Sequence, residues 1–202
     1  DVYKRQDEKL LGNRRMSIHD RVTRSRAATE VSLSPYLIAE AGVNHEGNMD
    51  TARLLIEEAA KGGADAIKFQ TYRAHTIAAK NSPAYWDIEK EPTKSQFQLF
   101  QKYDKFWKKE FEDLKVCCDN FGIEFLSTPF DLEAVRFLDE LVDVFKISSS
   151  DITNKPFIEA ICTYGKPIIL STGASNHAEI REALQWIDSG GDGVPVALLH
   201  CV

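Results

Sequence analysis

Residues 36–70 read YLIAEAGVNHEGNMDTARLLIEEAAKGGADAIKFQ, and this stretch decides the fold. Two short apolar runs, at 36–42 and 64–70, flank a segment that Asn48 or Asp50 is suited to begin as a helix N-cap. Within that segment apolar side chains recur at the spacing of one helix face, namely at Ala52, Leu55, Ile56 and Ala59. The stretch therefore predicts a strand, an amphipathic helix and a second strand, which is the repeating unit of a parallel sheet.

The same alternation continues to the end of the chain. Further apolar runs bounded by Gly and polar residues predict strands buried on both faces at 123–128, 142–148, 166–171 and 194–200. Helical stretches separate them: 107–120, 154–165, one that Asp131 begins, and one with a capping box of Asn176 and Glu179. Five strand–helix units and a sixth strand are compatible with a doubly wound sheet or with a (β/α)₈ barrel.

Two features favour the barrel. Polar residues follow every predicted strand instead of gathering at one switch point, and no Gly-rich dinucleotide fingerprint follows the first strand. Six strands do not close an eight-stranded barrel, and the apolar last strand would leave an exposed sheet edge. We therefore expect a TIM-type (β/α)₈ barrel truncated after about six strands, the N-terminal part of a longer protein. Residues 1–34 are expected to be a flexible leader, and residues 35–202 the barrel.

The composition restricts the class of protein. The 202 residues are 43% hydrophobic and 28% charged, as in a soluble globular protein with one sizeable core. No apolar run suits a membrane span and no signal segment opens the chain, so we expect a cytoplasmic protein without membrane contact. The net charge is -6, and residues 1–30 hold eight Lys/Arg against five Asp/Glu, so the rest is more acidic still. This argues against nucleic-acid binding. Four cysteines without C-x-x-C spacing predict reduced thiols.

The polar residues that follow the strands point to an anion site. Lys68 and Lys146 each lie between apolar residues of a predicted buried strand, where reaching solvent without a partner is costly. Hydroxyl residues follow other strands, and although each alone is typical of a turn, together with the lysines they suit phosphate or carboxylate oxygens. They are Ser127, Thr128, Ser148, Ser149, Ser171 and Thr172.

Carboxylates lie at the same predicted mouth. Glu40 and Asp151 suit proton transfer or the water shell of a metal. His45 and His200 are predicted to be hydrogen-bonded structural histidines, because the spacing of a complete metal site is lacking. The connection 71–106 is long for a compact domain, and such a loop is usually functional or a lid.

Six motifs in order carry a resemblance to a known family: AEAGVNHEGN, AIKFQT, FLSTPFD, FKISSSD, GKPIILSTG and ALLHC. Over residues 36–202 the chain resembles the sialic acid synthases, the NeuB-like enzymes that also make legionaminic and pseudaminic acids. The resemblance implies a TIM barrel followed by a small antifreeze-like domain, and a homodimer in the full-length protein. It also implies condensation of phosphoenolpyruvate with an N-acetylated amino sugar, assisted by a divalent metal, Mn²⁺ or Mg²⁺.

Carried over motif by motif, the resemblance gives each candidate residue a role. Gln70 would face the sugar, and Asn81 in the long connection would contact it. Glu40 and Asp151 would be catalytic, although Asp151 stands where many relatives have a glutamate that is one methylene longer. The phosphate and carboxylate of phosphoenolpyruvate would be held by Lys68, Thr128, Lys146, Ser149 and Ser171.

The resemblance places two metal-binding histidines on later strands, and a sugar-binding arginine in the antifreeze-like domain of a partner subunit. No metal ligand is therefore predicted in this chain, and we expect the chain alone to be inactive. Three alternatives stay open. One is a related phosphoenolpyruvate-dependent synthase of 3-deoxy-sugar phosphates, which would prefer a phosphorylated aldose. Another is an aldolase with a Schiff base on Lys68 or Lys146. The third is an inactive barrel fragment that acts as a binding module.

Overall fold

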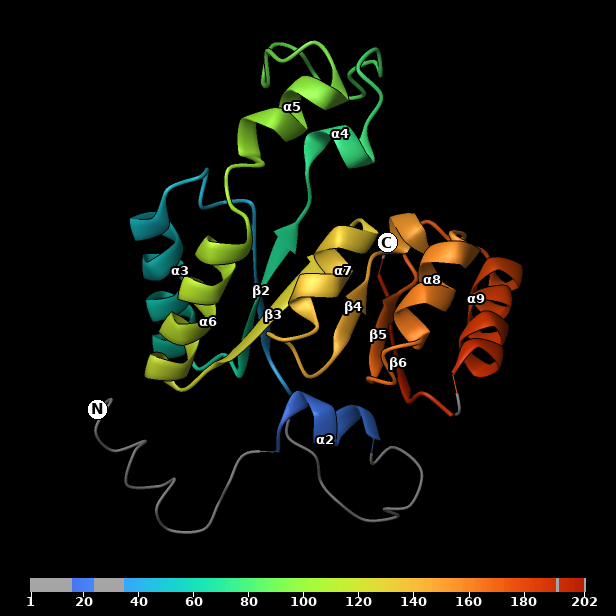
Figure 1. The fold of residues 1–202 in the computed structure, drawn as a ribbon. Coiled ribbons are helices and arrows are strands. Elements are labelled where there is room, and N and C mark those ends of the chain that lie inside the picture. The colour runs from blue at the N-terminus through green and yellow to red at the C-terminus, as the bar shows by residue number, and fades with distance from the viewer. Residues whose placement is uncertain (1–15, 24–34, 192, 202) are drawn as a thin grey trace.

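The computed structural model describes residues 16–23, 35–191 and 193–201 of the chain (Figure 1). All six predicted strands are present. They form two three-stranded parallel sheets in the orders β1-β2-β3 and β4-β5-β6. The strands are β1 (Ile38–Gly42), β2 (Ala66–Thr71), β3 (Glu124–Pro129), β4 (Phe145–Ile147), β5 (Ile168–Ser171) and β6 (Val196–Leu199).

The strand order decides between the two predicted architectures. Within each sheet neighbouring strands follow one another in sequence, and β3 lies beside β4, so the strand order does not reverse. A doubly wound fold instead reverses its strand order at a switch point. The chain is thus part of a TIM-type barrel, as predicted. Leu198 and Leu199 of β6 are 47% and 38% exposed, which agrees with the predicted open edge at the last strand.

The helices begin where the sequence predicts. The Asn48 side chain, and not that of Asp50, caps α3 by accepting from the backbone N–H groups of Asp50 and Thr51. Asp131 caps α7, and Asn176 with Glu179 forms the predicted capping box of α9. These helices and the two between them are α3 (Met49–Lys61), α6 (Lys108–Phe121), α7 (Leu132–Leu138), α8 (Lys155–Cys162) and α9 (His177–Gly190). Within the described residues, no helix has the length and apolar character to cross a membrane.

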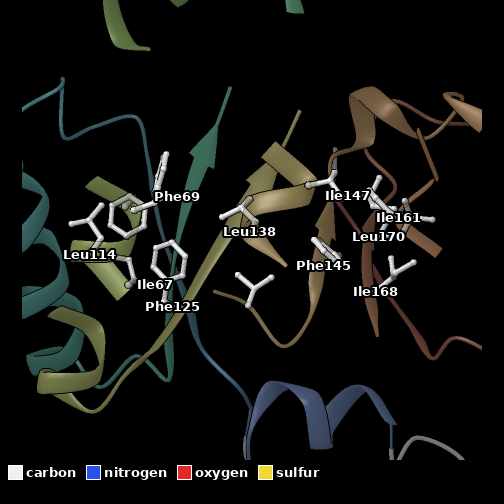
Figure 2. Close-up of a cluster of buried hydrophobic side chains, with 14 of the residues drawn as sticks. Ile67, Phe69, Leu114, Phe125, Leu138, Phe145, Ile147, Ile161, Ile168 and Leu170 are labelled. Carbon is white, nitrogen blue, oxygen red and sulfur yellow. The ribbon is translucent and has the colours of Figure 1, made fainter. Parts of the chain in front are cut away.

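The main core lies between the strands and these helices. Side chains alternate along β2, so that Ile67 and Phe69 point outward to the helices while Lys68 points inward. Figure 2 shows this layer, which runs across both sheets and includes Phe69 of β2 and Leu170 of β5. The thiols of Cys118 and Cys162 are buried and those of Cys117 and Cys201 are partly exposed, and all four cysteines are free.

A second, smaller core fills the inside of the barrel at its N-terminal end. Helix α2 (Ile18–Thr23) lies beneath the strands, and its residues Ile18 and Val22 are 6% and 4% exposed (Figure 1). The Ile18 N–H donates to the Glu124 carboxylate at 3.2 Å. The inward strand residues of this core come from both sheets: Ala66, Leu126, Val144 and Ile169.

Helix α2 corrects one expectation. The prediction of a flexible leader over residues 1–34 is wrong for Ile18–Thr23, which fold as a plug against the barrel. The rest of that prediction, residues 1–15 and 24–34, lies outside the described residues. The helix escaped prediction because its two buried side chains give no sustained periodicity, and they become a core only against the strand ends.

The plug gives a first testable prediction. Replacing Ile18 by alanine is expected to lower the free energy of unfolding by about 2–4 kcal/mol, because the side chain leaves a cavity between α2 and both sheets. Ile88, which is 54% exposed, is the matched control, and Ile88→Ala should change stability by no more than about 0.5 kcal/mol. Urea denaturation followed by circular dichroism measures both. Equal losses in the two variants would contradict the plug.

Candidate active site

The inward face of the strands changes from apolar to polar along the barrel. Strand side chains alternate with a period of two, so the residue two positions beyond each inward apolar residue also points inward. Along the first five strands, the apolar residues that belong to this inner core are Ile38, Ala66, Leu126, Val144 just before β4, and Ile169. Two positions further along each strand stand Glu40, Lys68, Thr128, Lys146 and Ser171. Parallel pairing therefore gathers five of the predicted residues at the carboxyl ends of the strands.

Lys68 is the centre of this group. Its Nζ lies 2.6 Å from Oε2 of Glu40 and donates to Oγ1 of Thr128 at 3.0 Å. Glu40 stands opposite Lys68 in the β1–β2 register, which brings the two side chains together. The Lys68 side chain is 13% exposed and the Glu40 side chain 51%. The Lys68 ammonium group is thus enclosed, whereas the Glu40 carboxylate that contacts it is half exposed to solvent.

Lys146 supplies a second, more deeply buried amino group. Only 6% of the residue is exposed, and its Nζ donates to the backbone carbonyl of Ile147 at 2.6 Å. Burial is the main cause that lowers the pKa of Lys146 to about 8, and the positive charge of Lys68 lowers it further. The negative charges of Glu40 and Asp151 act in the opposite direction, so all four groups share one electrostatic environment. An amino group held in this way is suited to an incoming anion.

Asp151 and Ser149 follow directly after β4, in the short 3₁₀ helix η1 (Ser149–Asp151). Burial raises the pKa of the Asp151 carboxyl above its usual value, and hydrogen bonds from Asn154 and Ser150 partly offset this. The charge of Lys146 also lowers that pKa. The chain therefore turns at once after the strand and places a carboxyl group with a raised pKa within the field of Lys146, which suits proton transfer.

Gly42 is a feature that the sequence analysis missed. Its φ is +54°, and the β1–β2 register shifts between Glu40 and Gly42. A Cβ atom added there would lie 3.4 Å from Oε1 of Glu40 and 3.6 Å from Nε2 of Gln70. Because Gly42 has no side chain, the Glu40 carboxylate and the Gln70 amide can both lie close to it. A glycine that ends a buried strand is the signal that could have identified it.

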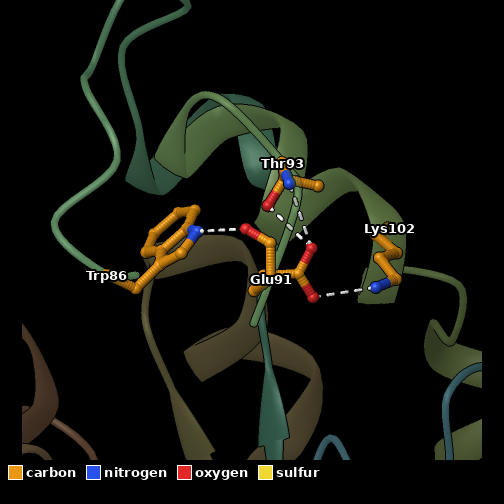
Figure 3. A network of polar contacts seen from close by, with 4 residues as sticks. All are labelled: Trp86, Glu91, Thr93 and Lys102. Atoms are coloured by element: carbon orange, nitrogen blue, oxygen red, sulfur yellow. Dashed lines mark hydrogen bonds and ion pairs between the residues drawn. The ribbon is translucent and has the colours of Figure 1, made fainter. Parts of the chain in front are cut away.

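The long connection after β2 rises above the polar end of the barrel (Figure 1). It contains α4 (Ala74–Ile77) and α5 (Gln96–Tyr103). Figure 3 shows how it is held: the Glu91 carboxylate accepts from Lys102 at 2.9 Å and from Thr93, while Trp86 Nε1 donates to the Glu91 carbonyl at 3.0 Å. This network fixes residues 86–102 as one folded unit above the strand ends.

Asn81 is not brought into the cluster by any contact of its side chain among the described residues. It lies exposed in the turn after α4. Its contact with a sugar remains a prediction.

His45 has the structural role that the sequence predicts. It is 2% exposed, and burial lowers its pKa to about 4, so the ring is neutral. Its Nδ1 accepts from the Gly47 N–H at 3.1 Å, and its ring stacks on Phe106 with centroids 4.0 Å apart. His45 therefore ties the loop after β1 to the end of the long connection.

The described residues do not by themselves form a metal centre. Within residues 16–23, 35–191 and 193–201, no three His, Cys, Asp or Glu side chains come together as ligands.

Comparison with known proteins supports the resemblance seen in the motifs. The NeuB family profile matches residues 55–202. The N,N'-diacetyllegionaminic acid synthase of Campylobacter jejuni is 43% identical over 169 residues, which are 82% of this chain and 50% of that enzyme. The chain spans about half the length of the curated relatives it matches.

Solved structures agree with the fold. The N-acetylneuraminic acid synthetase of Leptospira borgpetersenii superposes with a TM-score of 0.72 at 35% identity, covering 87% of this chain and 59% of that one. A truncated 3-deoxy-D-arabino-heptulosonate 7-phosphate synthase of Thermotoga maritima gives a TM-score of 0.56 at 15% identity, over 81% of this chain and 50% of that one. The second likeness concerns the fold alone. From the ordered motifs, the barrel topology and the profile match over most of its length, the chain belongs to the NeuB family.

Proposed function

We propose that the protein condenses phosphoenolpyruvate with an N-acetylated amino sugar, of the kind of N-acetylmannosamine, to give a sialic-acid-type nonulosonate and phosphate. The observation that carries the proposal is the pair of enclosed amino groups, Lys68 and Lys146, at the carboxyl ends of neighbouring sheets. Relatives named as legionaminic acid and neuraminate synthases support the same reaction.

In this proposal the chain's own residues hold the anionic substrate. Phosphoenolpyruvate carries a phosphate and a carboxylate, and two amino groups within one electrostatic environment suit both. The hydroxyl groups of Thr128, Ser149 and Ser171 would donate directed hydrogen bonds to the same oxygens. Fixing this substrate converts its encounter with the sugar into an oriented reaction.

The bond changes follow from the enol character of the substrate. The electron pair of its C2–C3 double bond forms a bond from C3 to the aldehyde carbon of the sugar, whose oxygen takes up a proton. Water adds at the cationic C2 and gives a proton to Glu40 or Asp151, which are proposed as the base. The bond between C2 and the bridging oxygen of the phosphate then breaks, and phosphate leaves with the electron pair and takes up the proton of the new C2 hydroxyl, so that a keto group remains.

A divalent metal, Mn²⁺ or Mg²⁺, would supply Lewis acidity toward the aldehyde oxygen. Its ligands are proposed to lie outside the described residues. Gln70 and Asn81 are proposed to contact the sugar, and the full-length protein is proposed to be a homodimer. Inactivity of the 202-residue chain alone also stays a prediction, so binding, and not turnover, is the measurement that tests the proposal.

Phosphoenolpyruvate titrated into the chain in a calorimeter should bind saturably at one site, with inorganic phosphate as a competitor. Incubation with pyruvate and borohydride should leave the mass of the chain unchanged. A covalent pyruvate adduct on Lys68 or Lys146 would instead favour the Schiff-base aldolase. Absence of any phosphoenolpyruvate binding would contradict the proposed function.

A further inference from the structure

Lys68 is already occupied before a substrate arrives. The Glu40 carboxylate lies 2.6 Å from its Nζ, at the position where an oxygen of an anionic substrate would bind the same ammonium group. Two anions competing for one enclosed cation repel each other. Phosphoenolpyruvate therefore binds Lys68 either beside Glu40, against that repulsion, or in its place.

The surroundings of the pair favour replacement. Lys68 is held on a second side by Thr128 Oγ1 at 3.0 Å and is 13% exposed, so it is the fixed partner. Glu40 is 51% exposed, and no side chain at Gly42 occupies the space beside its Oε1. An ion pair with one half-exposed partner is weak, because water screens the exposed charge. A multiply charged ligand that also contacts Lys146 interacts with two amino groups, and this interaction is stronger than that of Glu40 with Lys68 alone.

We propose that Glu40 and phosphoenolpyruvate exchange on Lys68, so that substrate binding breaks the ion pair and releases the carboxylate. No covalent bond changes in this step: the ammonium group exchanges one anionic partner for another. The proposal rests on the proposed function and deepens it, because it makes the base available only after the nucleophilic substrate is in place. It also makes Glu40 an internal competitor that disfavours anions too small to contact both amino groups.

The test compares the affinity for phosphoenolpyruvate of wild type and Glu40→Gln by calorimetry. Glutamine keeps the shape and removes the competing charge, so the Kd should fall about tenfold. Glu46→Gln is the matched control, because it removes one negative charge from an exposed position in the loop after β1, and its Kd should stay within about twofold of wild type. In a Lys68→Met background, Glu40→Gln should change the Kd by less than about twofold.

The outcomes separate the two proposals. If wild type binds phosphoenolpyruvate and Glu40→Gln binds it equally well or more weakly, the exchange is overturned. The proposed function would still stand. An equal gain in Glu40→Gln and Glu46→Gln would also overturn it, because the effect would then be one of general charge. Failure of both wild type and Glu40→Gln to bind would overturn the proposed function together with the exchange.

Discussion

Replacing Lys146 by methionine is expected to raise the Kd for phosphoenolpyruvate about a hundredfold. The amino group is buried in the barrel interior, where a charge-assisted hydrogen bond to an anion contributes up to about 3 kcal/mol. Methionine fills a similar volume without the charge, so the fold should be kept. Lys115→Met is the control, because Lys115 pairs with Asp119 on the surface of α6. Calorimetry measures both variants, and an unchanged Kd in Lys146→Met would contradict the assignment.

The same residue gives a pH dependence. The pKa of Lys146 is lowered to about 8, chiefly by burial, so its amino group is charged below that pH and neutral above it. Affinity for phosphoenolpyruvate should therefore fall as the pH rises through about 8. In Lys146→Met this fall should disappear, whereas Lys115→Met should keep it. The range from about pH 7 to about pH 9 brackets the pKa of Lys146. A wild-type Kd that stays constant over this range would contradict the proposed contact.

The second large effect concerns the main core between the strands and the helices. Phe111→Ala is expected to lower the free energy of unfolding by about 3–5 kcal/mol. Phe111 is 1% exposed on α6, and its ring contacts Phe106, Phe125 and Phe137 at centroid distances of 6.3, 6.5 and 6.1 Å. A cavity here would therefore separate the helix from β3 and from α7.

Phe121 on the same helix provides the matched control. It is 39% exposed, so Phe121→Ala should cost about 1 kcal/mol or less. Urea denaturation of both variants gives the comparison. Since whole domains are stable by only about 5–15 kcal/mol, Phe111→Ala should lie close to unfolding at room temperature. Similar midpoints for the two variants would show that the ring contacts do not hold α6 in place.

The fold was largely predictable because its determinants are local. Each strand is a short apolar run, and each main helix has an amphipathic stripe, with caps such as Asn48 and Asp131 readable from the sequence. Helix α2 was not predictable, since the burial of Ile18 and Val22 depends on strand ends far away in the chain.

The site was predictable as a set of residues but not as a set of contacts. Strand periodicity places Lys68, Thr128 and Lys146 on the inward face, and the structure brings them to one level of the barrel. The ion pair of Lys68 with Glu40 depends on the β1–β2 register and on the shift at Gly42. Those are properties of strand pairing, which residue types alone do not specify.

A crystal structure of the chain soaked with phosphoenolpyruvate tests the central claim most directly. We expect phosphate or carboxylate oxygens of the ligand within about 3 Å of both Lys68 Nζ and Lys146 Nζ. The Glu40 carboxylate should then have moved away from Lys68. A ligand bound elsewhere, or one at this site that leaves the two lysines without contact, would contradict the account.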